Sequence, residues 1–142
     1  MNVYRLLLGG VASSAVMWLL EALASQLYEN QMLTALRTHE LALDIMGSAW
    51  FWSVVIALLI GLTMSFMYVA MRNRFGPGPR TATLAASVLW LGGYVPALIG
   101  YDMIGLYGRR LLLQWGIVGW FEMVIGGIGG AWIYREAKPA AP

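Results

Sequence analysis

The chain has 142 residues, of which 60% are hydrophobic and 11% are charged, and its formal net charge is +2. Soluble domains carry about 25% charged residues, so this chain has too few charges to cover a surface that faces water. It contains no cysteine and one histidine, which excludes disulfides, thiolate metal sites and a haem held by two histidines of one chain. We therefore expect no metal and no cofactor.

Four segments are long and apolar enough to cross a bilayer as helices, which takes about 20 residues. They are residues 3–27, 49–71, 81–101 and 111–134. Apolar residues fall on every side of these segments rather than alternating, which argues against β-strands. The sequence therefore predicts an all-α integral membrane protein with a single domain over residues 1–142.

The first segment also has features of a secretory signal peptide. Arg5 precedes an apolar run, and Ala22, Leu23 and Ala24 together have the form of a cleavage site. Glu21 and Trp18 fit poorly into the end of such a signal. We therefore expect the segment to remain as an uncleaved first helix.

The connections predict how the helices are arranged. Residues 28–48 mix leucines with charged residues, which is typical of a short amphipathic helix at the membrane interface, although a solvated loop fits nearly as well. Residues 75–80 (FGPGPR) form a stiff turn, and residues 101–110 form another short link. Because short links make consecutive helices antiparallel neighbours, the expected fold is an up-and-down four-helix bundle.

Small residues recur at helical spacing, which allows helix backbones to approach closely. We expect them to pack helices together within one chain, and a seam between two copies is the alternative. Pro96 removes a backbone donor from the third segment and predicts a structural kink there. The small residues of the second and fourth segments are Ser53, Ala57, Gly61, Ser65, Gly119, Gly126 and Gly130.

Two acids lie within the predicted spans. Glu122 is near the middle of the fourth segment, and Glu21 lies roughly 10 Å from the outer end of the first, at about 1.5 Å per residue. A charged acid at such depth costs about 2.5 kcal/mol or more, so both should face protein, and helical spacing places each on its helix's small-residue face. With no basic residue at similar depth, we expect them to be neutral or hydrogen-bonded to Ser14, Tyr94, Gln114 or a tryptophan N–H.

These acids support two interpretations. The first is a polar contact that determines which helices pair, and the second is a proton, cation or substrate site with Glu21, Glu122, Gln114 and Asp102 as its candidate residues. Asp102, near the outer end of the third segment, is expected to pair with Arg109 or Arg110 as a surface contact.

Basic residues predict the orientation, because loops on the cytoplasmic side carry more of them. Three lie on the side of the 28–48 connection, namely Arg37, Arg109 and Arg110. Both termini and the glycine–proline turn are therefore expected in the cytoplasm, with the protein in a bacterial inner membrane. Orientation accounts for the basic residues, so nucleic acid is not an expected partner. The six on the cytoplasmic side are Arg5, Arg72, Arg74, Arg80, Arg135 and Lys138.

Three blocks, residues 4–10 (YRLLLGG), 74–79 (RFGPGP) and 130–136 (GAWIYRE), resemble those of short uncharacterised bacterial membrane proteins of four helices. That resemblance implies no activity. The size, the helix number and an acid in the first helix are also those of small multidrug transporters. The proline- and glycine-rich motifs of their second and third helices are missing, so that family is not assigned.

The sequence contains no serine–histidine–acid set and no phosphate-binding glycine loop, so we do not expect an enzyme. The favoured hypothesis is a non-catalytic membrane component: an accessory subunit, or a self-associating bundle whose partners are lipid, copies of itself or other membrane subunits. The alternative is a small proton- or cation-coupled transporter that uses Glu122 and Glu21. A lipid-modifying enzyme acting through Glu21 or Asp102 is a weaker third hypothesis.

Overall fold

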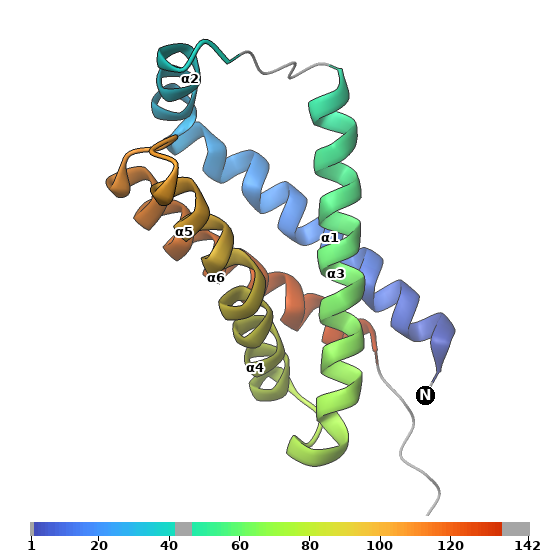
Figure 1. Cartoon of the computed structure of the whole chain (residues 1–142). Coiled ribbons are helices and arrows are strands. Elements are labelled where there is room, and N and C mark those ends of the chain that lie inside the picture. Colours follow the sequence, from blue (N-terminus) through green and yellow to red (C-terminus); the bar gives the residue numbers. More distant parts are fainter. Residues whose placement is uncertain (1, 42–46, 135–142) are drawn as a thin grey trace, which may run out of the picture.

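The structure is a computed structural model that describes residues 2–41 and 47–134. Within these residues every regular element is helical, which confirms the all-α prediction (Figure 1). The elements are α1 (Val3–Ala24), the 3₁₀ turn η1 (Ser25–Leu27), α2 (Glu29–Thr38), α3 (Ser48–Phe75), α4 (Pro79–Leu89), the π-helical turn η2 (Trp90–Tyr94), α5 (Val95–Met103) and α6 (Arg109–Ile133).

Four helical stretches are long and apolar enough to cross a membrane. They are α1 with η1, α3, the continuous run of α4, η2 and α5, and α6. The second is longer than predicted, because α3 continues to Phe75 rather than ending at residue 71. Its last turn contains Arg72 and Arg74, whose positive charges are favourable beside the carbonyls at a helix C-terminus.

The connection after the first span is helical over α2, as the amphipathic alternative predicted. Only Leu36 of α2 is buried, so most of this helix remains exposed. Asp44 of the same connection lies outside the described residues, as do Arg135 and Lys138 of the predicted cytoplasmic charges.

Helix α1 packs against α3 on one side and α6 on the other, while α4 packs against both α6 and α3. Glycines make these approaches possible. A Cβ atom at Gly61 of α3 would lie 2.5 Å from the carbonyl oxygen of Gly10, and one at Gly130 of α6 would lie 2.5 Å from that of Gly9. Neither backbone contact leaves room for a side chain, so these small-residue faces are used within the chain.

The helices are closed together at the end that carries the glycine–proline turn, here called the turn end. Tyr68 and Tyr134 pack edge to face there, with ring centroids 6.3 Å apart, and Arg72 lies 5.2 Å from the Tyr134 ring centre. The Tyr68 hydroxyl also accepts a 3.2 Å hydrogen bond from the Gly78 N–H. The buried apolar cluster at this end consists of Leu6, Tyr68, Val69, Ala82, Ala85 and Tyr134.

At the opposite end, here called the α2 end, α3 diverges from α1 and α6 after crossing α1 (Figure 1). The third span is interrupted by η2, where the Val95 N–H donates to the carbonyl of Trp90, five residues earlier. This wide turn occurs directly before Pro96, at the place where a kink was predicted. Such turns are frequent at functional sites, and this one positions Tyr94 beside α6.

Candidate functional site

A cavity of about 500 Å³ lies between α1, α3 and α6. That volume is within the range of small-molecule sites, roughly 300–1,000 Å³. Its walls are mostly apolar and aromatic, and two carboxyl groups lie on it. The lining residues are Met17, Trp18, Glu21, Ala22, Ser25, Ala49, Trp50, Ser53, Ile56, Ala57, Ile60, Tyr94, Gly119, Glu122 and Met123.

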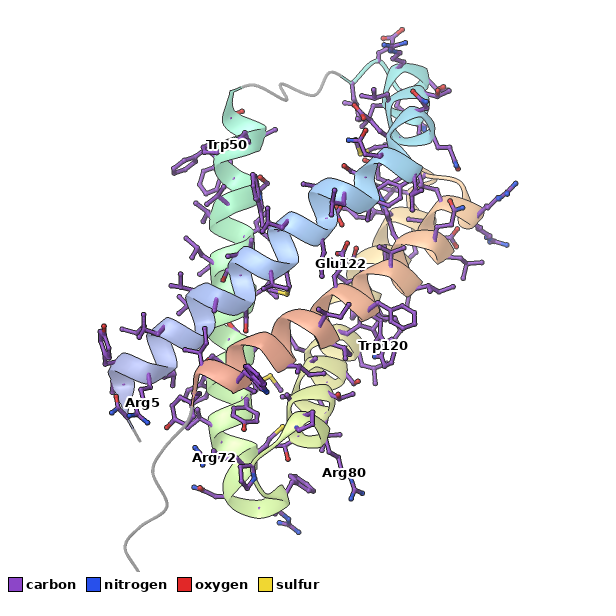
Figure 2. The ribbon with its side chains drawn as sticks, turned by 180° about the vertical axis from the view of Figure 1, so that it is seen from behind. Arg5, Trp50, Arg72, Arg80, Trp120 and Glu122 are labelled. Carbon is purple, nitrogen blue, oxygen red and sulfur yellow. The ribbon has the colours of Figure 1, made fainter. Side chains whose placement is uncertain are left out.

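The two acids predicted within the spans meet at this cavity. Figure 2 shows Glu122 between α1 and α6, and its side chain lines the same cavity as that of Glu21. The cavity therefore brings two carboxyl side chains to one space with mostly apolar walls, the buried Glu122 and the exposed Glu21.

Glu122 is the more deeply buried member of the pair. The residue is 9% exposed, and its Oε1 atom has no hydrogen-bond partner within the described part of the chain. A buried polar atom without a partner costs about 1–3 kcal/mol. Glu122 thus lines the cavity, while its Oε1 is an enclosed acceptor without a partner among the described residues.

Glu21 has a partner that was not predicted. The hydroxyl of Tyr28 donates a 2.5 Å hydrogen bond to Oε1 of Glu21. Tyr28 is 3% exposed, and its ring packs edge to face on Trp115 at 5.6 Å. Burial, and next the hydrogen bond to Glu21, raise the pKa of the Tyr28 phenol well above its usual range, so Tyr28 acts as a fixed donor.

Sequence reasoning missed Tyr28 because it was placed at the start of the connection. The 3₁₀ turn η1 extends the first helix to Leu27, so a residue seven positions after Glu21 returns to the same helical face. That spacing is visible in the sequence, because the first span was already predicted to reach Leu27 and Tyr28 directly follows it.

Tyr94 forms part of the cavity wall opposite α1. It lines the same cavity as Glu21 and Glu122. A Cβ atom at Gly119 would lie 2.7 Å from Cζ of Tyr94, so the glycine lets the Tyr94 ring rest directly on α6. Tyr94 was among the expected partners of the acids, and the structure places it beside them.

The rim of the cavity is built by two tryptophans and a serine. The Trp18 indole N–H donates to Ser53 Oγ at 3.2 Å, and the Ser53 hydroxyl donates to the Trp50 carbonyl at 2.7 Å. The two indole rings are edge to face at 6.3 Å. Ser53 and Ala57, expected to pack helices, instead line the cavity.

The remaining predicted packing residues lie in helix contacts. Ser65 of α3 donates to the Leu6 carbonyl of α1 at 2.9 Å. A Cβ atom at Gly126 of α6 would lie 3.0 Å from the Ser13 carbonyl oxygen of α1. Together with Gly61 and Gly130, these residues hold α3 and α6 against α1.

Three predicted polar residues do not join the carboxyl pair. Ser14 donates to the Gly10 carbonyl at 2.8 Å, within its own helix. Gln114 does not line the cavity, and its buried Oε1 has no partner among the described residues. Asp102 accepts from Nε of Arg109 at 3.1 Å in an exposed ion pair, so Arg109 is its partner in the structure.

The described residues contain no group of three or more histidine, cysteine, aspartate or glutamate side chains able to hold a metal ion. A comparison with known proteins finds no matching family model, no matching curated protein and no matching solved structure.

Proposed function

We propose that the chain is a multi-pass protein of the bacterial inner membrane with four antiparallel transmembrane helices in up-and-down order. Four long apolar helices support this proposal. Arg5, Arg72 and Arg80 lie toward one end of the molecule, opposite Trp50 (Figure 2), and such an excess of arginine favours the cytoplasmic side. Both termini and the turn end then face the cytoplasm, and the α2 end faces outward.

We further propose that the protein is a small proton- or cation-coupled carrier that binds its cargo at Glu21 and Glu122. The observation that carries this proposal is that the cavity reaches Glu122. If Glu122 only joined helices, its carboxyl oxygens would be paired with groups on another helix. Its Oε1 instead lacks a partner among the described residues, and the residue lines a space large enough for a ligand.

The two ends of the molecule also differ as a carrier requires. At the α2 end, Trp50 and Ala49 of the first turn of α3 line the cavity. At the turn end, the buried cluster around Tyr68 and Tyr134 fills the space between the helices. A site reached from one side and closed on the other is one of the two states of alternating access.

The hypothesis of an accessory subunit rested on glycine-rich faces available for partners. Gly9 and Gly10 of α1 contact Gly130 and the helix around Gly61, so those faces are already covered within the chain. We take this packing within the chain as support for the carrier over the self-associating bundle.

A carboxyl-reactive reagent tests whether the site is open. Dicyclohexylcarbodiimide adds to protonated carboxylic acids in apolar surroundings, and the adduct is measured by intact mass in lipid nanodiscs. We expect an adduct that maps to Glu21 or Glu122 and is lost in the double variant E21Q/E122Q. Glu29→Gln is the matched control, because Glu29 does not line the cavity. An unreactive wild-type protein would refute an open site.

Transport itself is tested in proteoliposomes that contain a pH-sensitive dye. Small amines, alcohols and carboxylic acids are added outside one at a time. A coupled carrier changes the internal pH for its cargo, and the change should be absent in Glu122→Gln vesicles, which also report passive leakage. If the internal pH changes equally in wild-type and Glu122→Gln vesicles for every solute, proton coupling is contradicted.

A further inference from the structure

We infer that a groove between α5 and α6 binds one molecule of phosphatidylethanolamine, with an acyl chain in the groove and the headgroup on the ion pair of Asp102 and Arg109. This groove is separate from the cavity at Glu122, because the two have no lining residue in common. The lipid site rests on the transmembrane placement proposed above, and it is independent of the proposed carrier activity.

The groove has a volume of about 420 Å³ and mostly apolar walls. On its buried side Leu112 is 7% exposed, and the Trp90 indole N–H donates to the carbonyl of Gly116 at 3.0 Å. That hydrogen bond satisfies the indole, so this side presents apolar surface to the groove. At the edges, Ile99 and Ile117 are 54% and 61% exposed. The groove therefore opens on the outside of the helices, where a transmembrane protein meets lipid.

The groove occupies one half of the membrane-spanning length. Along the third span, Pro79–Met103, it runs from Asp102 to Trp90, which lies at the middle of that span. At about 1.5 Å per residue this length is about 18 Å, slightly more than half of a hydrocarbon core about 30 Å thick. Along α6 it starts at Arg109 and ends at Ile117. The groove thus has the depth of one leaflet, which suits one acyl chain.

The charged end of the groove has the chemistry of a headgroup site. Asp102 and Arg109 are the acid and the base among the described residues that line it, so the lining has no net charge. Their side chains are 39% and 85% exposed and are joined through Nε of Arg109 at 3.1 Å. A guanidinium has further N–H donors beyond Nε, and their planar fork matches a phosphate. The neighbouring carboxylate accepts from an ammonium.

Phosphatidylethanolamine carries both complementary groups. Its phosphate and its primary ammonium are joined by a short ethylene link, so one headgroup can contact Arg109 and Asp102 together. The trimethylammonium of phosphatidylcholine has the same charge but no N–H to donate to Asp102. Phosphatidylglycerol has the phosphate but no cation. Tyr101 and Tyr107 pack edge to face at 5.4 Å beside this end, and tyrosines are typical of the headgroup level.

The three lipids, with identical acyl chains, test the headgroup site. The full chain in mild detergent is titrated with each lipid, and bound lipid is counted by native mass spectrometry. We expect phosphatidylethanolamine to bind at least about fivefold more tightly than the other two, as one charge-assisted hydrogen bond allows. Asp102→Asn should remove this preference. Glu29→Gln should retain it, because Glu29 does not line the groove.

Filling the groove tests the place of the acyl chain. Ile117→Trp puts a larger side chain at its open edge and should weaken phosphatidylethanolamine by at least about fivefold. Ile125→Trp is the matched control, because Ile125 lies on the same helix, is 48% exposed and does not line the groove. Leu113→Trp, at another lining residue that is 67% exposed, provides the same test if Ile117→Trp does not fold by circular dichroism.

Three results would each overturn the lipid site. They are equal binding of the three lipids by the wild type, an unchanged preference in Asp102→Asn, and full phosphatidylethanolamine binding when the groove is filled. None of these would refute the transmembrane placement, which is tested separately by labelling the glycine–proline turn and α2 from the two sides of the membrane. If both are labelled from the same side, the placement itself is refuted.

Discussion

The hydroxyl of Tyr28 donates to Oε1 of Glu21 across 2.5 Å, from a position just beyond the last turn of the first helix. Through this bond the α2 end of the molecule holds one member of the carboxyl pair. The other member, Glu122, keeps Oε1 unpaired. One of the two carboxyl groups therefore has a tyrosine partner, whereas the other has a buried oxygen without a partner among the described residues.

Replacing Tyr28 by phenylalanine should lower the free energy of unfolding by about 1 kcal/mol near neutral pH, the typical contribution of one hydrogen bond. The raised pKa of Tyr28 also predicts a pH effect. The unfolded chain loses the phenol proton near pH 10 while the folded chain retains it. The contribution of Tyr28 is thus complete below about pH 10 and declines as the pH rises further.

The measurement for Tyr28 is thermal unfolding in detergent at pH 8 and pH 11. Wild-type protein should lose more stability between these values than Tyr28→Phe does. Tyr4→Phe serves as the control, because Tyr4 is 71% exposed. Identical losses in the wild type and Tyr28→Phe would contradict the role given to this phenol.

Glu122→Gln and Glu122→Leu separate a site from a structural contact. If Glu122 joined helices, leucine would leave a partner unsatisfied and lower the melting temperature. Because its Oε1 has no partner, we expect Glu122→Leu to leave the melting temperature unchanged or raise it. Both variants should lose solute-driven pH change in vesicles. A large drop in stability for leucine with little for glutamine would restore the structural interpretation.

Gly61→Ala should destabilise the helix crossing. The added Cβ would lie 2.5 Å from the Gly10 carbonyl oxygen and 2.7 Å from the Ser14 nitrogen, so the backbones must separate, at a cost of about 1–3 kcal/mol. Gly100→Ala is the matched control, since a Cβ there meets nothing within 4 Å and alanine favours a helix by about 1 kcal/mol. In thermal unfolding, Gly61→Ala should have a lower melting temperature than the wild type, whereas Gly100→Ala should not. Equal melting temperatures for the two variants would refute the close crossing.

Gly119→Ala should alter the cavity more than the fold. The new Cβ would lie 2.7 Å from Cζ of Tyr94 and 2.9 Å from its hydroxyl oxygen, and the ring end of a side chain moves more easily than a backbone. We expect tyrosine displacement into the cavity, with slower carbodiimide labelling and a nearly unchanged melting temperature. Labelling at the wild-type rate would show that Tyr94 does not border the reactive carboxyl.

Cysteine labelling tests the proposed orientation, because the chain has no cysteine of its own. A cysteine at Gly78 in the turn should react with a membrane-impermeant maleimide only after the cells are opened. A cysteine at His39, at the end of α2, should react in intact cells. The reverse pattern would invert the assignment of both termini.

Hydropathy was sufficient to predict the four spans, because each is a long apolar run with few charges. The meeting of Glu21 with Glu122 was also foreseeable in part, since both acids occupy small-residue faces and first and last helices are neighbours in an up-and-down order. The position of Pro96 indicated where the third span is irregular. The π-helical form of η2 depends on local packing that the position of a proline does not specify.

The cavity was not predictable from the sequence. Ser53 and Ala57 have the same size and spacing as Gly61 and Ser65, so the pattern assigned all four to one packed face. The structure separates them, because α3 diverges from α1 beyond the crossing at Gly61 (Figure 1). The angle at which two helices cross depends on the combined shapes of many side chains on both helices. The spacing of small residues along one helix does not specify that angle.

The close contact between Gly10 and Gly61 is a point near the middle of α3 about which this helix can rotate relative to α1. Gly61 lies close to the middle of Ser48–Phe75, so each arm is about 20 Å long at 1.5 Å per residue. With nearly equal arms, a rotation that swings Trp50 toward α6 moves the Phe75 end away from its neighbours by a similar distance. A carrier of the proposed kind would therefore close one side and open the other by turning α3 about this glycine.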